Sequence, residues 1–143
     1  MDKKEIIDFI NANLACNLAT IEGNKPHVRG MMIYKADEKG ILFHTWKMKD
    51  LHQQLIKNPY IELAFFNPKQ MVQVRVSGEA ELIEDMDLKK QVVNTPGREY
   101  LKQWIEEKKL FGYDGLSVFR VKNCKATVWT MSTNFEEKKY ITL

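Results

Sequence analysis

The chain has 143 residues, a length that predicts one domain with a hydrophobic core of its own. Hydrophobic residues make up 44% and charged residues 29%, and the net charge of +3 is too small to indicate a nucleic-acid-binding protein by itself. Cys16 and Cys124 match no zinc spacing, and no stretch approaches the ~20 apolar residues that span a membrane. We expect no signal peptide at the N-terminus and therefore a cytoplasmic protein with reduced thiols.

The first third of the chain predicts one helix and three strands. Asp2 can cap a helix over about residues 3–14, in which apolar residues recur at three- and four-residue spacing. Short apolar runs separated by glycine-containing turns then predict strands at 17–21, 28–34 and 41–45. Because tight turns join them, we expect these strands to form an antiparallel meander.

The rest of the chain alternates between helical and strand patterns. A helix is predicted at 49–57, and residues 85–110 show helical spacing on both sides of a break at Thr95-Pro96-Gly97. Further strands are predicted at 60–66, 72–83, 116–121, 126–131 and 140–143. These patterns predict a mainly β (α+β) fold in which six to seven antiparallel strands close into a barrel with flanking helices, and residues 1–143 form a single domain.

One group of residue types indicates a binding site. If the second and third predicted strands pair as a hairpin, Arg29 lies near Thr45 and near Lys49 at the start of the next helix. A guanidinium, a hydroxyl, an ammonium and free helix amides are the groups that hold a phosphate. A single arginine or lysine is more often a surface residue, so the prediction depends on their joint placement around one helix start. His44 directly precedes Thr45 and is a further candidate, whereas the spacing of the three histidines indicates no metal site.

Five stretches of the chain carry a family resemblance. They are Pro26–Tyr34, Phe43–Leu51, Gln54–Pro59, Gln73–Gly78 and the pair Val128-Trp129. In their order and spacing they resemble the split-barrel family that binds flavin mononucleotide (FMN) and is typified by pyridoxamine 5′-phosphate oxidase. The resemblance runs from about Phe9 to Met131. It implies an antiparallel split β-barrel, FMN as the cofactor, and a homodimer with its two sites at the subunit interface.

The resemblance also implies which residues bind FMN. The matching positions are Arg29, Thr45 and Lys49 for the phosphate, and Gly30, Met31, Met32, Gln73 and Trp129 for the ring and its surroundings. Gln73 would reach the flavin from the partner subunit, and Trp129 would stack near the ring or line the substrate pocket. Plainer roles stay open, because methionine and tryptophan often pack in cores and a glutamine on an alternating strand can simply face solvent.

The sequence differs from the oxidase in the segments with which that enzyme binds its substrate. The predicted helices over 85–110 do not match the oxidase motif, and Glu136–Leu143 is unlike the arginine-containing tail of the oxidase. We therefore expect an FMN-dependent oxidoreductase that passes hydride or electrons between a reduced donor and a small molecule other than a pyridoxal phosphate precursor. No side chain stands out as a catalytic acid or base.

Two other functions remain open from the sequence. The first is a protein that binds flavin, haem or a deazaflavin without turnover, since the same barrel could hold such a flat cofactor. The second is a small barrel that stacks single-stranded nucleic acid on exposed aromatic residues. The weak charge balance disfavours this second alternative, and we expect no nucleic-acid partner.

Overall fold

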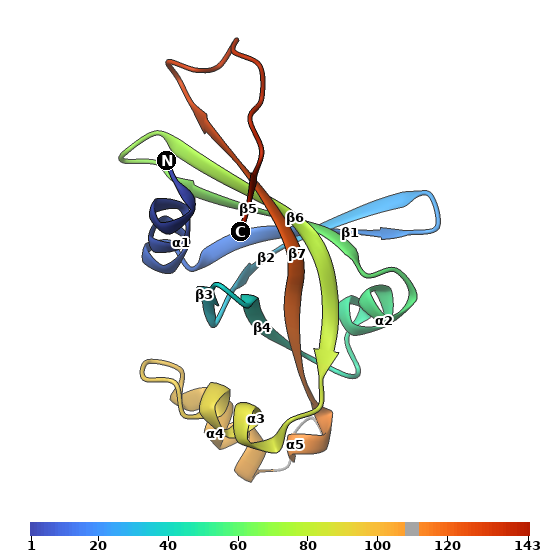
Figure 1. The fold of residues 1–143 in the computed structure, drawn as a ribbon. Coiled ribbons are helices and arrows are strands. Elements are labelled where there is room, and N and C mark those ends of the chain that lie inside the picture. The colour runs from blue at the N-terminus through green and yellow to red at the C-terminus, as the bar shows by residue number, and fades with distance from the viewer. Residues whose placement is uncertain (108–111) are drawn as a thin grey trace.

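The protein is described by a computed structural model over residues 1–107 and 112–143, and this part of the chain contains five helices and eight strands (Figure 1). The helices are α1 (Lys3–Ala12), α2 (Asp50–Lys57), α3 (Met86–Val93), α4 (Glu99–Glu106) and α5 (Gly112–Gly115). The strands are β1 (Ala15–Glu22), β2 (Lys25–Met32), β3 (Lys35–Asp37), β4 (Gly40–Trp46), β5 (Tyr60–Asn67), β6 (Val72–Ile83), β7 (Leu116–Thr130) and β8 (Ile141–Thr142). The last residues of the helical pattern predicted over 85–110 lie outside the described residues. Within those residues, no helix is long and apolar enough to cross a membrane.

The strands form one antiparallel sheet that closes into a split barrel. Hydrogen-bonded neighbours follow the order β2-β1-β5-β6-β7-β4-β3, and β8 pairs with β7. The two ends of this path, β2 and β3, are consecutive in the chain. Between them, the Ile33 amide donates to the carbonyl of Leu14 (3.0 Å), and the Tyr34 amide donates to the carbonyl of Leu42 (2.7 Å). The chain thus passes from β1 to β4, which closes the barrel and confirms the predicted fold class.

The predicted pairing of the second and third strands is wrong. β2 pairs with β1, whereas β4 pairs with β3 and β7. The apolar run at 28–34 looks continuous in sequence, but the chain changes its hydrogen-bonding partner at Ile33 and Tyr34. The hairpin that precedes β4 is therefore made by the short strand β3, which the sequence pattern did not separate from its surroundings.

The two strands predicted at 116–121 and 126–131 are a single strand, β7. The polar residues between the two predicted strands belong to a β-bulge, at which the register of β7 against β6 shifts between Ser77 and Glu79. Asn123 adopts a positive φ of 54°, a conformation that asparagine tolerates better than most residues. The strand thus bends at a bulge where the sequence pattern predicted a break.

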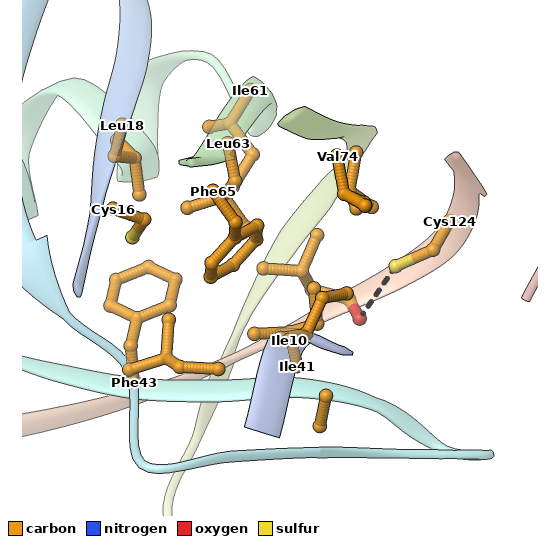
Figure 2. Packing of buried hydrophobic residues seen from close by; sticks show 14 of the residues in the cluster. Ile10, Cys16, Leu18, Ile41, Phe43, Ile61, Leu63, Phe65, Val74 and Cys124 are labelled. Carbon is orange, nitrogen blue, oxygen red and sulfur yellow. Dashed lines mark hydrogen bonds between the residues drawn. The ribbon is translucent and has the colours of Figure 1, made fainter. Parts of the chain in front are cut away.

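Aromatic and aliphatic side chains that alternate inward along the strands fill the barrel. Phe43, Phe65 and Phe119 are buried, and the rings of Phe43 and Phe119 stack with centroids 5.6 Å apart. Figure 2 shows Phe43, Phe65 and Cys16 facing one another in this core. Burial raises the pKa of the Cys16 thiol to about 12 and that of Cys124 to about 11, so both cysteines are neutral packing residues at pH 7.

A second cluster packs α3 and α4 against the outside of the barrel. Its buried members are Leu42, Trp46, Val92, Val93, Leu101, Ile105, Leu116 and Val118. Leu42 and Trp46 alternate with Phe43 along β4, so this strand serves both clusters. Figure 1 shows α3, α4 and α5 gathered at the end of the barrel where β6 stops and β7 begins.

Candidate functional site

A polar pocket of about 610 Å³ lies between β2 and the first turn of α2. We call it the Arg29 pocket, and its lining residues are Glu22, His27, Val28, Arg29, Lys49, Asp50, Leu51 and Gln54. Arg29 and Lys49 thus share a site, as the sequence predicted. They meet because α2 packs against β1, the neighbour of β2, and not because β2 pairs with β4.

Hydrogen bonds inside the pocket hold the Arg29 guanidinium in one position. Its Nη1 donates to Thr20 Oγ1 (2.8 Å) and to the Leu18 carbonyl (3.3 Å), and its Nη2 donates to Gln54 Oε1 (2.5 Å). The Thr20 hydroxyl donates to the same Gln54 oxygen at 2.6 Å. Burial lowers the pKa of Arg29, and the nearby Asp50 carboxylate opposes that shift. At least two of the five guanidinium N–H groups are left for a ligand.

The start of α2 adds a second source of positive charge. Lys49 is its N-cap residue and makes no side-chain capping hydrogen bond. In contrast, Asp2 and Asp85 cap α1 and α3 through their carboxylates. The first amides of an uncapped helix carry partial positive charge and can donate to an anion. Asp50, in the first turn of α2, is negative and would compete with such an anion.

His27 lines the Arg29 pocket and carries a ring nitrogen, Nε2, that is buried and has no hydrogen-bond partner in the part of the chain that the structure describes. The Glu22 carboxylate lies 3.9 Å away, which is too far for a hydrogen bond. Buried polar atoms in native structures normally have a partner, so this unpaired nitrogen is an exception.

Thr45 and His44 face opposite sides of β4. Thr45 alternates with Phe43 and is buried on the inner side, opposite Ser117 of β7. The Ser117 hydroxyl is hydrogen-bonded to Nδ1 of His52 in α2 at 2.8 Å. Thr45 therefore lies in the layer that anchors α2, and neither it nor His44 lines the Arg29 pocket as described.

His44 belongs to the environment of the helices α3 and α4. Its ring packs edge-on against Trp46, with centroids 6.2 Å apart, and its Nδ1 is buried without a partner among the described residues. Burial lowers the pKa of His44 to about 4, and the charges of Arg98 and Lys49 add to that shift. His44 is thus neutral at pH 7.

The residues that resemble flavin-ring contacts divide between the two faces of β2. Val28, Gly30 and Met32 are exposed on the outer face, whereas Arg29 and Met31 point inward. Met31 packs against the barrel core, which matches the plainer role that methionine often has. Met32 keeps 51% of its surface exposed and is free to contact a ligand or another protein surface.

Gln73 and Trp129 lie together but apart from the Arg29 pocket. They are opposite each other in β6 and β7 and line a separate cavity of about 560 Å³. The two cavities have no lining residue in common. Between β2 and β6 the sheet contains β1 and β5, so three strand spacings, or ~14 Å, separate these strands. One chain therefore carries the two halves of the predicted site at different places.

The sequence did not indicate two residues that line the Arg29 pocket, His27 and Gln54, or Thr20, which hydrogen-bonds Arg29 and Gln54. Thr20 and His27 carry no pattern that distinguishes them from other strand residues. Gln54 offered a signal, because it lies one helical turn from Leu51 on the apolar side of α2, where a buried amide needs partners.

A closed antiparallel barrel with a polar pocket at a helix start defines the split β-barrel class of proteins. Residues 2–130 match the family described as pyridoxamine 5′-phosphate oxidase, and the chain belongs to that family. The pyridoxine/pyridoxamine 5′-phosphate oxidase of Haemophilus influenzae is 29% identical over 106 residues, which is 73% of this chain and 50% of that protein. The oxidase of Azotobacter vinelandii is 35% identical over 74 residues, which is 51% of this chain and 34% of that protein. The chain thus spans at most about half the length of these relatives.

Solved structures with low sequence identity share the fold. A NimC/NimA family protein from Clostridium acetobutylicum has a TM-score of 0.74 at 20% identity, covering 98% of this chain and 91% of that one. A pyridoxamine 5′-phosphate oxidase-related, FMN-binding protein from Nostoc punctiforme has a TM-score of 0.64 at 14% identity, covering 99% and 96%. At these identities the likeness shows the fold alone.

Replacing Gln54 with leucine should destabilise the protein. The buried Thr20 hydroxyl and the Arg29 guanidinium would lose their common acceptor, at a cost of about 1–3 kcal/mol in the free energy of unfolding. Urea denaturation measures this change. Gln53→Leu is the matched control, because Gln53 is exposed on the same helix and should leave stability nearly unchanged. Equal effects of the two substitutions would contradict the anchoring role of Gln54.

His44 should make the protein less stable as the pH falls. Its folded pKa of about 4 lies below the ordinary 6.5, so the unfolded chain takes up the proton first. The contribution of His44 to the free energy of unfolding is complete above about pH 6.5 and falls by ~3 kcal/mol toward pH 4. Urea denaturation between about pH 7 and pH 4.5 should show a flatter profile for His44→Gln. The pKa of His52 is also lowered, by burial and by Lys47, so His52 should still contribute some pH dependence in the variant. Identical pH profiles for the wild type and His44→Gln would contradict the role of His44.

Proposed function

We propose that this protein binds FMN with the phosphate in the Arg29 pocket and acts as an oxidoreductase on a small molecule. The observation that carries the proposal is the fixed Arg29 guanidinium beside Lys49 at the uncapped start of α2. Charge-assisted hydrogen bonds from such groups are the usual way in which proteins hold a phosphate dianion. Membership of the pyridoxamine 5′-phosphate oxidase family supports FMN as the compound that carries this phosphate.

The residues of the Arg29 pocket would contact the phosphate in different ways. Arg29 and Lys49 would supply charge, and the first amides of α2 would donate to the phosphate oxygens. Because Thr45 is buried and does not line the pocket, we assign to it the support of the helix start instead of direct phosphate contact. These groups fit an anion, although Asp50 and Glu22 weaken the attraction.

A second copy of the chain would complete the flavin site. The outer face of β2 exposes Val28 and Met32, with 70% and 51% of their surfaces accessible, which suits contact with a flat ring or a partner surface. Within one chain, Gln73 and Trp129 line a separate cavity on the outer face of the sheet, whereas Arg29 points inward. In a homodimer, Gln73 and Trp129 of one copy would face the flavin held by the other, as the family resemblance implies.

Bound FMN would supply the hydride or electron transfer itself. The described residues would bind the phosphate, orient the ring against the exposed backbone at Gly30 and exclude water between the two copies. A protein that binds flavin without turnover would use the same groups. Steady-state oxidation of a reduced nicotinamide donor by the FMN-loaded protein, compared with free FMN, distinguishes an enzyme from such a carrier.

Replacing Arg29 with alanine should weaken FMN binding. Loss of a charged hydrogen bond costs ~1.5–3 kcal/mol, so we expect roughly a tenfold to hundredfold higher dissociation constant. Riboflavin, which lacks the phosphate, should bind the variant and the wild type alike. Quenching of flavin fluorescence during titration measures both affinities.

Two further variants make the test of the phosphate site specific. Asp50→Asn should strengthen FMN binding, because it removes the carboxylate that competes at the start of α2. Arg120→Ala, in β7 outside the Arg29 pocket, is the control and should leave the affinity unchanged. FMN affinity that is insensitive to Arg29, or riboflavin affinity that falls in parallel, would refute the assigned phosphate site.

A further inference from the structure

The cavity that contains Gln73 and Trp129 lies on the outer face of β6 and β7. We call it the Trp129 pocket. The segment that follows β7 leaves the end of the barrel and returns as β8 alongside β7 (Figure 1). Residues of this segment, among them Thr133, Asn134 and Ile141, line the cavity together with the strands. Its volume of about 560 Å³ lies within the range of small-molecule sites. The Trp129 pocket is thus enclosed by β6 and β7 on one side and by the segment between β7 and β8 on the other.

A hydrogen bond to the segment between β7 and β8 holds the Trp129 ring in place. Its Nε1 donates to Oδ1 of Asn134 at 2.7 Å. The hydroxyls of Thr130 and Thr133, 2.8 Å apart, tie the same segment to the end of β7. A fixed indole ring in the wall of a cavity offers a stacking surface for a flat, apolar ligand.

Arg75 supplies a cation that lacks a hydrogen-bond acceptor. It follows Gln73 by two residues on the same face of β6 and lines the Trp129 pocket. Among the described residues it forms an ion pair with Glu62, whose carboxylate is 3.7 Å from Nε, too far for a hydrogen bond. The Nε atom itself is buried and unpaired. The terminal Nη groups of Arg75 remain as charged donors that can hydrogen-bond a ligand carboxylate.

The spacing of Trp129 and Arg75 limits the size of the ligand. Trp129 is directly opposite Gln73, and Arg75 is opposite Thr127, so the tryptophan and the arginine are diagonal neighbours across the two strands. Diagonal positions on an antiparallel pair are about 7–8 Å apart. A ligand of one or two fused aromatic rings has a length of this order, which suits contact with both side chains.

We propose that the Trp129 pocket binds a planar aromatic carboxylate, with its ring on Trp129 and its carboxylate on Arg75, and that this is the substrate class of the protein. The assignment as substrate rests on the proposed function, because it requires the flavin of a second copy to lie beside Gln73 and Trp129. Gln73 and Thr127 can hydrogen-bond a neutral ligand equally well. The segment between β7 and β8 adds Lys138 and Lys139, whose charges are offset by Glu136 and Glu137, so we assign the preference for a carboxylate to Arg75 on β6.

A pair of probes that differ only in charge tests this assignment. Isothermal titration of the full chain, with and without FMN, would use 2-naphthoate and its neutral analogue 2-naphthamide. We expect the wild type to bind the carboxylate about tenfold more tightly, which is the value of one charged hydrogen bond. Arg75→Gln should abolish this preference while retaining the amide affinity, and Arg75→Lys should retain part of it. Trp129→Leu should weaken both probes.

The controls separate this inference from the proposed function. Arg120→Gln, which removes a cation elsewhere on β7, should keep the preference for the carboxylate. Equal binding of the two probes by the wild type, or a preference that survives Arg75→Gln, would overturn the inference. FMN affinity is measured on the same samples. Normal FMN binding without a preference for 2-naphthoate overturns only the substrate class. An Arg75-dependent preference without FMN binding supports the pocket and overturns the proposed function.

Discussion

The two hydrogen bonds accepted by Gln54 Oε1 are the interaction on which the site depends. One comes from Thr20 of β1 and the other from Arg29 of β2, so a single buried amide joins α2 to two strands. A buried acceptor that serves two donors fixes their relative positions, because movement of any one group leaves another unsatisfied. The guanidinium and the start of α2 are thereby held on opposite sides of one pocket, which is the arrangement that a phosphate needs.

The way in which the barrel closes makes this arrangement possible. The chain leaves β1 and joins β4 at Ile33 and Tyr34, and β4 then leads directly into α2. As a result, α2 crosses back over β1 to reach the inner side of β2, although β2 and β4 are not neighbours in the sheet. The hydrogen bond between Ser117 and His52 holds the same helix to β7. The site is therefore a consequence of barrel topology as much as of local sequence.

Much of the fold could be predicted from the sequence, because helix caps and strand alternation are local signals. Asp2 marks the start of α1, and the apolar positions along β6 alternate as expected. The pairing of β4 with β7 could not be predicted in this way, since a change of partner at Ile33 depends on contacts distant in the chain. The bulge at Asn123 was invisible for the same reason.

The candidate site was predictable in part. Arg29 and Lys49 were placed together correctly from their residue types and from the family resemblance, even though the assumed hairpin was wrong. His44 and Thr45 are adjacent in a strand, so a two-residue period alone puts their side chains on opposite faces. Gln54 could have been found from its place on the apolar side of α2, but its two donors, Thr20 and Arg29, come from strands distant in the chain and are shown only by the structure.

The central claim is that the Arg29 pocket holds the phosphate of FMN. A crystal structure of the protein with FMN tests it most directly. The account predicts phosphate oxygens within hydrogen-bond distance of Arg29 and of the first amides of α2, with Gln73 and Trp129 of a second copy beside the ring. Density for the phosphate at any other place, or a flavin contacted by one copy alone, would contradict it.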